Sequence, residues 1–565
     1  MMMVMNLSHL LPLGIPLPSP TSLLGIFLIG TFTLLSSILL SAIYNLTLHP
    51  LARHPGPFFH RASILPYLYR QITGTLPCSI LDFHTRYGPV VRISPNALSF
   101  ADPQAWKDIY GHRPHGEEEF AKLNLFYRIK GSPPSLLSET KEAHGALRKL
   151  MAQGFSDRSM RAQEGIIGGY VSALIRGLRG NCSSSSSGKR EEDVVKQQDG
   201  GVQVVSEEEE EEKETTVINM KNTNTKQTEN MNQKEEHDGR VPLDMVSWYN
   251  WTTFDIIGDL AFGEPFGCLE KAEYDPWVDA VGKSVRFGCV MFALRLLGLE
   301  DWVCPLVRKL SGNARRFHRK RTMDKLQRRV KLTKERPDFL EGLLQKREEW
   351  GIDMDALAAN ASLLIVAGSE TTATLLAGAT YMLLRDPEAM KKLTEEVRST
   401  FKSEEEITLS SVGNLEYMLA CLNEAMRLYP PVPIGMPRVV PKGGAKVAGT
   451  FVPEGTVVAV WHWATSHNEQ HFVEPFEFHP ERWMQDPRFA NDRLDAVQPF
   501  SVGPRNCIGR SLAIAEMRLI LTKVVYNFDM KLANPDKDWL DQHIYTLWDK
   551  HPLPVYLTPV ERNGV

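Results

Sequence analysis

Residues Phe500 to Gly509 read FSVGPRNCIG and place one cysteine, Cys507, in a turn that contains two glycines. Gly503 and Gly509 permit a tight backbone path that a larger side chain would block, and Arg505 supplies a fixed cation for a cofactor carboxylate. The run GRSLAIAEMRLILTKVV begins a helix directly after the cysteine, so backbone amide groups point at the sulfur and favour the thiolate. We therefore expect Cys507 to ligate the iron of a haem. The alternative is a buried, inert cysteine.

The composition narrows the classes of protein to which the chain can belong. Its 565 residues can bury a large core, and a net charge of -4, from 64 basic and 68 acidic residues, gives no reason to expect a nucleic-acid partner. The other cysteines lack paired or C-x-x-C spacing, which argues against a disulfide framework or a zinc site and fits a reducing compartment. They are Cys78, Cys182, Cys268, Cys289, Cys304 and Cys421.

The N-terminal part has the pattern of a membrane anchor. Residues 1–52 contain no Lys, Arg, Asp or Glu, and residues 23–44 are mostly apolar, about the length that spans a bilayer core. A cleaved signal peptide is the main alternative, but the chain lacks a basic start and a clear cleavage site. We expect a lumenal segment at 1–22, a transmembrane helix at 23–44 and a proline-rich hinge at 45–57. Three basic residues then indicate the cytosolic side, namely Arg53, Arg61 and Arg70.

The remainder, residues 58–565, is expected to form one large domain with an insertion. Residues 181–240 hold a serine run, six consecutive glutamates and a polar tract, and such a segment cannot bury enough apolar surface to offset its ordering entropy. We interpret it as a disordered surface loop or, alternatively, as a regulatory tail. Short strands are expected from Val90 and within residues 446–460, and a helix is expected after Asp386, its N-cap.

A long apolar helix is expected from Ala361 to Leu384, with the polar residues Glu370 and Thr371 near its middle. Polar groups inside an apolar helix are costly unless they are bonded or functional. If this helix crosses the face of the cofactor, Thr371 can bond a small ligand such as dioxygen, and Glu370 can relay protons to it from solvent. The alternative is a core helix whose Thr and Glu side chains are satisfied locally.

Glu424 and Arg427 are spaced i,i+3 and share one face of a predicted helix. This motif alone is weak, but residues 480–483 read PERW shortly before the cysteine turn, and Arg482 can close a buried charge network with the pair. Such a network fixes the geometry of a loop without adding much stability. We expect these three residues to be structural and to position the cysteine turn.

Three further residues have the chemistry of an anion-binding set. His144 and Arg148, spaced i,i+4, lie on one face of a predicted helix, and Arg438 follows a proline-rich turn. Each of them alone is more often a surface group than a ligand. Together with Arg505 they form a set suited to the two propionates of a haem.

The motifs occur in the order AGSETT, ExxR, PERW and FxxGxRxCxG, behind an N-terminal anchor and a proline hinge. This order resembles that of the cytochrome P-450 family of haem-thiolate monooxygenases, from residue 23 to about 557 apart from the insertion. The resemblance implies a mainly α fold with a smaller β region, the triangular helical haem domain of that family, behind a transmembrane helix. Residues 248–270 and 434–441 look like microsomal fungal enzymes of secondary metabolism, such as those similar to isotrichodermin C-15 hydroxylase.

The resemblance also implies roles for the residues named above. Cys507 would be the axial ligand of haem b, with Phe500 beside the sulfur and the basic set near the propionates. Glu370 and Thr371 would deliver protons for scission of bound oxygen. Many family members have Trp where His144 stands, but His can still donate a hydrogen bond. Pocket residues implied by analogy, each equally compatible with core packing, are Phe126, Ala367, Val432, Ile434, Met436 and Leu547.

Partners and location follow from the same resemblance. Electrons would come from NADPH through a membrane-bound NADPH-cytochrome P-450 reductase. One atom of dioxygen would enter an apolar small molecule, by hydroxylation or epoxidation of a terpenoid or polyketide secondary metabolite. The protein would be single-pass in the endoplasmic reticulum membrane, in contact with lipid, with a cytosolic catalytic domain. The alternatives are an oxygen-independent haem-thiolate isomerase or dehydratase, against which the Glu370-Thr371 pair argues, and a noncatalytic haem-binding protein.

Overall fold

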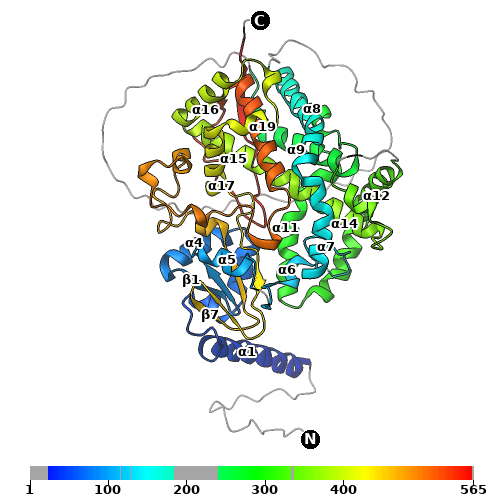
Figure 1. Ribbon diagram of the computed structural model, residues 1–565. Coiled ribbons are helices and arrows are strands. Elements are labelled where there is room, and N and C mark those ends of the chain that lie inside the picture. Colours follow the sequence, from blue (N-terminus) through cyan, green and yellow to red (C-terminus); the bar gives the residue numbers. More distant parts are fainter. Residues whose placement is uncertain are drawn as a thin grey trace, which may run out of the picture.

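Helices dominate the chain, as the sequence predicts, and the strands occupy a smaller region beside them (Figure 1). The expected lumenal segment, residues 1–22, and residues 183–239 of the expected insertion lie outside the described part of the chain. The first two residues of that expected insertion form the end of helix α8. The computed structural model describes residues 23–114, 116–128, 130–182, 240–332, 336 and 338–562.

The α-helices fall on either side of the insertion. Those before it are α1 (Leu23–Thr47), α2 (Phe58–Ala62), α3 (Leu65–Ile72), α4 (Leu76–Tyr87), α5 (Gln104–Tyr110), α6 (Asn124–Tyr127), α7 (Lys141–Met151) and α8 (Asp157–Cys182). Those after it are α9 (Met245–Phe262), α10 (Cys268–Lys271), α11 (Pro276–Leu296), α12 (Glu300–Lys331), α13 (Glu341–Gln345), α14 (Met354–Ile365), α15 (Thr371–Arg385), α16 (Pro387–Thr400), α17 (Glu416–Leu428), α18 (His462–Ser466) and α19 (Arg510–Asn527). A π-helical turn, η3 (Val366–Glu370), joins α14 to α15. The 3₁₀ turns are η2 (Ala152–Phe155), η4 (Glu404–Glu406), η5 (Ser411–Asn414), η6 (Pro480–Met484), η7 (Pro487–Phe489), η8 (Leu494–Ala496) and η9 (Gly503–Arg505).

Within the described residues, the strands form sheets of five, three and two members, ordered β1-β2-β8-β5-β3, β4-β10-β9 and β6-β7. The five-stranded sheet is mixed, because β2 pairs with β8 in parallel whereas the other pairs are antiparallel. The expected strands at Val90 and within residues 446–460 are present as β1 and as β6 to β8. The strands are β1 (Val90–Ser94), β2 (Ala97–Phe100), β3 (Ala121–Lys122), β4 (Leu243–Asp244), β5 (Arg438–Val439), β6 (Ala445–Val447), β7 (Thr450–Val452), β8 (Val457–Val460), β9 (Phe528–Leu532) and β10 (Pro554–Pro559).

Helix α1 projects from the folded body beside the five-stranded sheet (Figure 1). Its large apolar side chains face outward, with Phe27 67% and Phe32 66% exposed, and its length and composition suffice to cross a membrane. The helix continues three residues past position 44, into the segment expected to be the hinge. Its end is attached to the domain, because Asn45 Nδ2 donates to the Ala62 carbonyl oxygen at 2.9 Å and Arg92 Nη1 donates to the Asn45 carbonyl oxygen at 2.7 Å.

The core is built around one continuous helical segment, α14–η3–α15. The segment contains the helix expected from Ala361 to Leu384 and begins seven residues before it, at Met354. It is apolar enough to cross a membrane, but most of it is buried, since α9, α17 and α19 pack against it. The next helix, α16, begins as predicted, with the Asp386 side chain accepting hydrogen bonds from two N–H groups of its first turn. The π-helical turn η3 lies where the sequence placed its polar residues, and such turns are frequent at functional sites.

Candidate active site

The cysteine turn lies between η9 and α19 and packs against α5. The Cys507 N–H donates to the Phe500 carbonyl oxygen at 2.9 Å and closes the turn. Gly503 has a φ of +75°, and a Cβ there would lie 2.0 Å from the Tyr110 carbonyl oxygen, so only glycine fits this close approach. The Cys507 side chain remains accessible and lines a cavity, as a ligand to a bound group must.

The protein alone holds Cys507 as a thiol. Desolvation by the surrounding protein raises the pKa of this thiol although its surface borders the cavity, and the Gly509 N–H and the guanidinium groups of Arg148 and Arg510 act in the opposite direction. The helix amides and neighbouring cations, which are visible in the sequence, favour a thiolate, but the low polarity of the surroundings outweighs them. A metal ion that replaces the proton converts such a thiol into a thiolate. Cys507 is therefore better suited to ligate a metal than to act as a free nucleophile.

A cavity of about 300 Å³ separates the cysteine turn from the central helical segment. The turn and the start of α19 bound one side of it, and α14, η3 and α15 bound the other. Much of its lining is apolar, including Phe155 and Phe339, whose rings stack with centroids 4.4 Å apart. The site residues predicted from the sequence that line this cavity are Ala367, Thr371, Val432, Met436, Phe500, Arg505 and Cys507.

The predicted proton-delivery pair is divided between two cavities. The Thr371 hydroxyl donates to the Ala367 carbonyl oxygen at 2.6 Å and lines the cavity at Cys507. Glu370 lines a second cavity of about 400 Å³ and forms an ion pair with Lys550, whose Nζ also donates to Thr374 Oγ1 at 2.8 Å. The two side chains thus leave the helix on different sides. Lys550 was not anticipated from the sequence, because it follows Glu370 by 180 positions.

The predicted basic set is assembled around the same site. Arg148 holds the cysteine turn directly, since it donates to the carbonyl oxygen and to Oδ1 of Asn506 at 2.7 and 2.6 Å. Arg505 pairs with Glu119 at 2.6 Å. Arg438 donates to a backbone carbonyl group, and its buried Nε has no hydrogen-bond partner among the described residues. His144, on α7, is buried.

The electrostatics of this set show an excess of positive charge. Burial, together with the cations Arg505 and Lys122, lowers the pKa of His144 to about 3. Burial and the same arginine, with Arg438, lower the pKa of Lys122 to about 7. Of the ion pairs in the described part of the chain, only the one with Glu119 neutralises a member of this basic cluster, which comprises Lys122, His144, Arg148, Arg438 and Arg505. The cluster therefore fits a cofactor with two carboxylates, as a haem has, and Lys122 is the member that the sequence did not reveal.

The three residues of the expected structural network are in contact. Glu424 is fully buried and accepts hydrogen bonds from Arg427 at 2.7 Å, Arg482 at 3.2 Å and Trp483 at 2.9 Å. These arginines lower the pKa of Glu424 even though burial opposes them, so the carboxylate stays charged. Arg482 also pairs with Asp492, a partner that the sequence did not suggest. Arg427 donates to backbone carbonyl groups of the segment that leads to η6, namely Ser466, Pro475 and Glu477.

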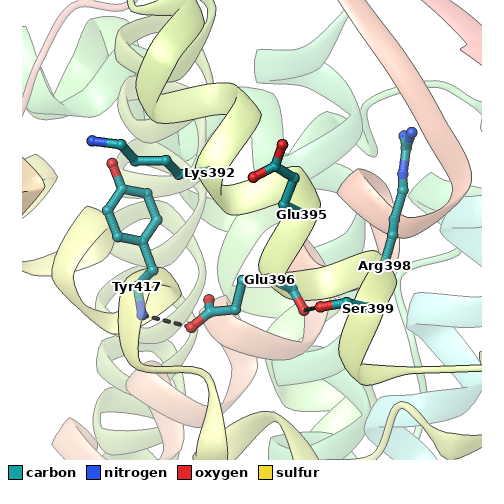
Figure 2. Close-up of a pocket in the computed structure, with 6 residues that line it drawn as sticks. All are labelled: Lys392, Glu395, Glu396, Arg398, Ser399 and Tyr417. Atoms are coloured by element: carbon teal, nitrogen blue, oxygen red, sulfur yellow. Dashed lines mark hydrogen bonds between the residues drawn. The ribbon is translucent and has the colours of Figure 1, made fainter.

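Two residues that line a surface hollow on α16 bind the PERW segment, residues 480–483, at the protein surface. Figure 2 shows Lys392 and Glu396 on this helix, with Tyr417 of α17 beside them. Glu396 accepts from the Tyr417 N–H at 2.7 Å and so caps the start of α17. Lys392 and the Tyr417 hydroxyl both donate to Glu481 of the PERW segment, at 2.6 and 3.1 Å. These bonds join α16, α17 and η6, so the hollow is structural and is formed by none of the residues that line the cavity at Cys507.

The pocket residues expected by analogy do not all meet in one place. Phe126 and Ile434 line a third cavity of about 420 Å³ rather than the one at Cys507. Leu547 lines neither of these two cavities, so its assignment to the pocket stays a prediction. It lies in a turn closed by the bond from the Tyr545 N–H to the Leu547 carbonyl oxygen at 3.0 Å, which brings the next residue, Trp548, against the core.

Sequence reasoning also missed Glu516, an acidic residue in the lining of the cavity at Cys507. This residue of α19 is 1% exposed, and its Oε1 has no hydrogen-bond partner among the described residues. Burial raises the pKa of its carboxyl group to about 8, so the group is mostly neutral at pH 7. Its place in the run that follows the cysteine, nine positions on, gives no signal of burial, because other charged residues, such as Arg510 and Arg518, occur in the same run.

The helical fold, the accessible cysteine in a closed turn and the cationic cluster fit the class of proteins that hold a haem through a cysteine thiolate. Comparison with known proteins gives the same class. A family model described as cytochrome P450 matches residues 209–553. Over 519 residues, 91% of each chain, the sequence is 45% identical to cytochrome P450 monooxygenase tpeC of Talaromyces stipitatus.

Two more relatives cover nearly the whole chain. Cytochrome P450 monooxygenase prhB of Penicillium brasilianum is 39% identical over 91% of this chain and 94% of its own. Averantin hydroxylase of Dothistroma septosporum is 39% identical over 91% of this chain and 88% of its own. The chain belongs to the cytochrome P450 family and is a monooxygenase, as the order of its motifs predicts.

Proposed function

We propose that this monooxygenase is anchored in a membrane and inserts one oxygen atom from dioxygen into an apolar small molecule. The reaction would be a hydroxylation or epoxidation in secondary metabolism, with a terpenoid or polyketide type of substrate. The observation that carries the proposal is the accessible Cys507, which faces a mostly apolar cavity with Thr371 on its opposite wall. The relatives support it, since one of them is named as a hydroxylase.

The cofactor would be haem b, held at two places. Cys507 would ligate the iron, with Phe500 beside the sulfur, and the basic cluster would bind the propionates. A bound haem with a thiolate ligand supplies the activation of dioxygen that attack on an unactivated C–H bond requires. Electrons would come from NADPH through NADPH-cytochrome P-450 reductase, which would dock on the face near Cys507.

The protein's own residues would exclude water and move protons. The apolar lining of the cavity keeps bulk water from the reacting atoms. The Thr371 hydroxyl, oriented by the Ala367 carbonyl oxygen, can hold a proton at Oγ1. Glu370 can exchange protons with solvent through the second cavity, but delivery to Thr371 requires its carboxylate to leave Lys550.

Helix α1 would place the enzyme in the endoplasmic reticulum membrane as a single-pass protein with a cytosolic catalytic domain. Its exposed apolar side chains need lipid to cover them. An apolar substrate would then reach the site partly from the bilayer. Protease treatment of intact microsomes tests the topology, since a domain protected in the lumen would contradict it.

The central experiment is turnover under isotopically labelled dioxygen. Full-length protein, reductase and NADPH are incubated with a panel of fungal terpenoids and polyketides, and the products are examined by mass spectrometry. We expect one labelled oxygen atom per product. Turnover without label would instead identify an isomerase or dehydratase. If the reductase reduces the haem-loaded protein but no compound is converted, the protein is a noncatalytic haem protein.

Thr371→Ala is expected to separate electron consumption from product formation. Loss of the hydroxyl removes the group that holds a proton in the cavity, so product per NADPH should fall about 10- to 100-fold while peroxide release rises. Thr371→Ser keeps a hydroxyl and should retain most of the product yield. Product and peroxide are measured per NADPH consumed, and equal yields in the alanine variant and the wild type would contradict the assigned role.

Lys122 is expected to make haem affinity depend on pH. Its pKa is about 7 in the haem-free protein, and the carboxylates of bound haem would raise it, so binding takes up a proton above that pH. Affinity should therefore be greatest below pH 7 and fall by up to about tenfold per unit above it. Lys122→Met should lower the affinity below pH 7 and remove this dependence. The exposed Lys149 provides a control, Lys149→Met.

The measurement is the transfer of haem to apomyoglobin over a series of pH values. Other groups titrate as well, so the informative quantity is the slope of the logarithm of haem affinity against pH, compared between the wild type and Lys122→Met. Lys149→Met should have the slope of the wild type. Equal slopes for the wild type and Lys122→Met would show that bound haem does not change the pKa of Lys122.

A further inference from the structure

The third cavity, of about 420 Å³, shares a wall with the cavity at Cys507. Val432 and Met436 line the cavity at Cys507, whereas Ile434, Gly435 and Pro437 line the third one, so one stretch of chain separates the two. Its other walls come from α3, the strands β1, β2 and β8, α6 and the end of α11. Most of the lining side chains are apolar.

One hydrogen-bond donor in this apolar cavity has no acceptor. Trp461 is 3% exposed, and its Nε1 has no partner within the described part of the chain. By contrast, Trp539 Nε1 donates to the His551 carbonyl oxygen at 2.9 Å. Trp251 Nε1 also lacks a partner, but that residue is not part of the wall of this cavity. Trp461 therefore combines an unpaired donor with a place beside an open space.

The edge of the indole that carries Nε1 borders Gly435. The two residues pair as an isolated antiparallel bridge. A Cβ at position 435 would lie 2.8 Å from Trp461 Nε1 and 2.9 Å from the Ala459 Cβ, so a side chain there would displace this edge of the ring. A buried donor without an acceptor is unfavourable. Trp461 lines the cavity, so a molecule bound there would lie beside a residue whose donor is unpaired.

We propose that this cavity binds an apolar small molecule that carries a carbonyl or ether oxygen, and that Trp461 Nε1 donates a hydrogen bond to that oxygen. The inference rests on the proposed function, since the site would hold the monooxygenase's own substrate behind the wall of the cavity at Cys507. Trp461 is then a binding residue that selects oxygenated molecules. A hydrocarbon of the same shape leaves the donor unpaired and binds more weakly.

The test compares 9-fluorenone with fluorene, two rigid molecules that differ in one carbonyl group. Binding to the full-length holoenzyme is measured by equilibrium dialysis, with 4-phenylimidazole in excess to occupy the cavity at Cys507. The wild type should bind fluorenone about tenfold more tightly than fluorene. Trp461→Phe keeps the ring but removes the donor, so this preference should disappear while binding of fluorene stays the same. Gly435→Ala should weaken both molecules, because its Cβ displaces the indole edge.

Trp539→Phe is the matched control, since it removes an indole N–H that already has an acceptor. It should keep the tenfold preference, and its melting temperature should drop, whereas Trp461→Phe should melt like the wild type. A preference for fluorenone that persists in Trp461→Phe would overturn the inference, and so would its absence in the wild type. Dialysis requires no turnover, so this result is independent of the labelled-dioxygen experiment and distinguishes failure of the binding site from failure of the proposed function.

Discussion

Cys507→Ser is expected to abolish the thiolate Soret band of the reduced, carbon-monoxide-bound protein and, with it, oxygen insertion. A serine hydroxyl has a far higher pKa than a thiol, so it loses its proton much less readily when iron coordinates it. Without the thiolate, a bound haem would lack the electron donation that supports activation of dioxygen. Turnover should fall below detection, while haem content should fall less, because the basic cluster would still bind the propionates. The spectrum and the product yield per haem measure the two effects separately.

Cys78→Ser is the control for this substitution. Cys78 is also an exposed free cysteine, but it lies on α4 and does not line the cavity. Its serine variant should keep the spectrum and the activity of the wild type. A Cys507→Ser protein that kept the thiolate Soret band would show that another residue ligates the iron.

Glu424→Gln is expected to have the second largest effect, through the fold. The substitution leaves the buried guanidinium groups of Arg427 and Arg482 with one carboxylate, Asp492, between them. Removal of one partner from a buried charge network costs about 3–5 kcal/mol, a large share of the roughly 5–15 kcal/mol by which a protein is stable. We expect most of the variant protein to misfold and to contain no haem. The fraction that folds should unfold at a much lower urea concentration than the wild type.

The matched control is a surface ion pair. Lys346 and Glu349 are 47% and 61% exposed and 2.5 Å apart, so Lys346→Ala should change the free energy of unfolding by less than about 1 kcal/mol. Haem content, urea unfolding and activity per haem are compared for both variants. The structural assignment predicts that any folded Glu424→Gln protein keeps normal activity per haem. Normal stability with lost activity would instead make Glu424 a participant in the chemistry.

The site residues that could be predicted from the sequence are those that belong to short motifs with fixed spacing. The turn around Cys507 needs its glycines and its cysteine at fixed spacing, and the Glu424-Arg427 pair follows from the helical repeat. Arg482 could be added because the PERW segment supplies a cation in a chain region that must pack near the pair. Helices with strong caps or long apolar runs, such as α15 and α16, were predictable for the same local reason.

The remainder depends on contacts between distant parts of the chain. Lys550 meets Glu370 across 180 positions, and Lys122 meets the basic cluster because β3 pairs with β5. A charged residue in a loop or short strand gives no sign of such a partner. The state of Cys507 and of Glu516 was equally hidden, because pKa shifts caused by burial depend on packing that no local pattern records.

The π-helical turn η3 ends at the point where the central helix separates a polar cavity from a mostly apolar one. Adjacent residues, Glu370 and Thr371, are directed to different compartments, one polar with Lys550 and one mostly apolar with Cys507. A single helix therefore separates the cavity that contains the Glu370–Lys550 ion pair from the cavity that Cys507 lines. A proton that crossed the helix at this point would therefore pass between the side chains of two neighbouring residues, so a substitution at either one changes only the compartment that its side chain lines.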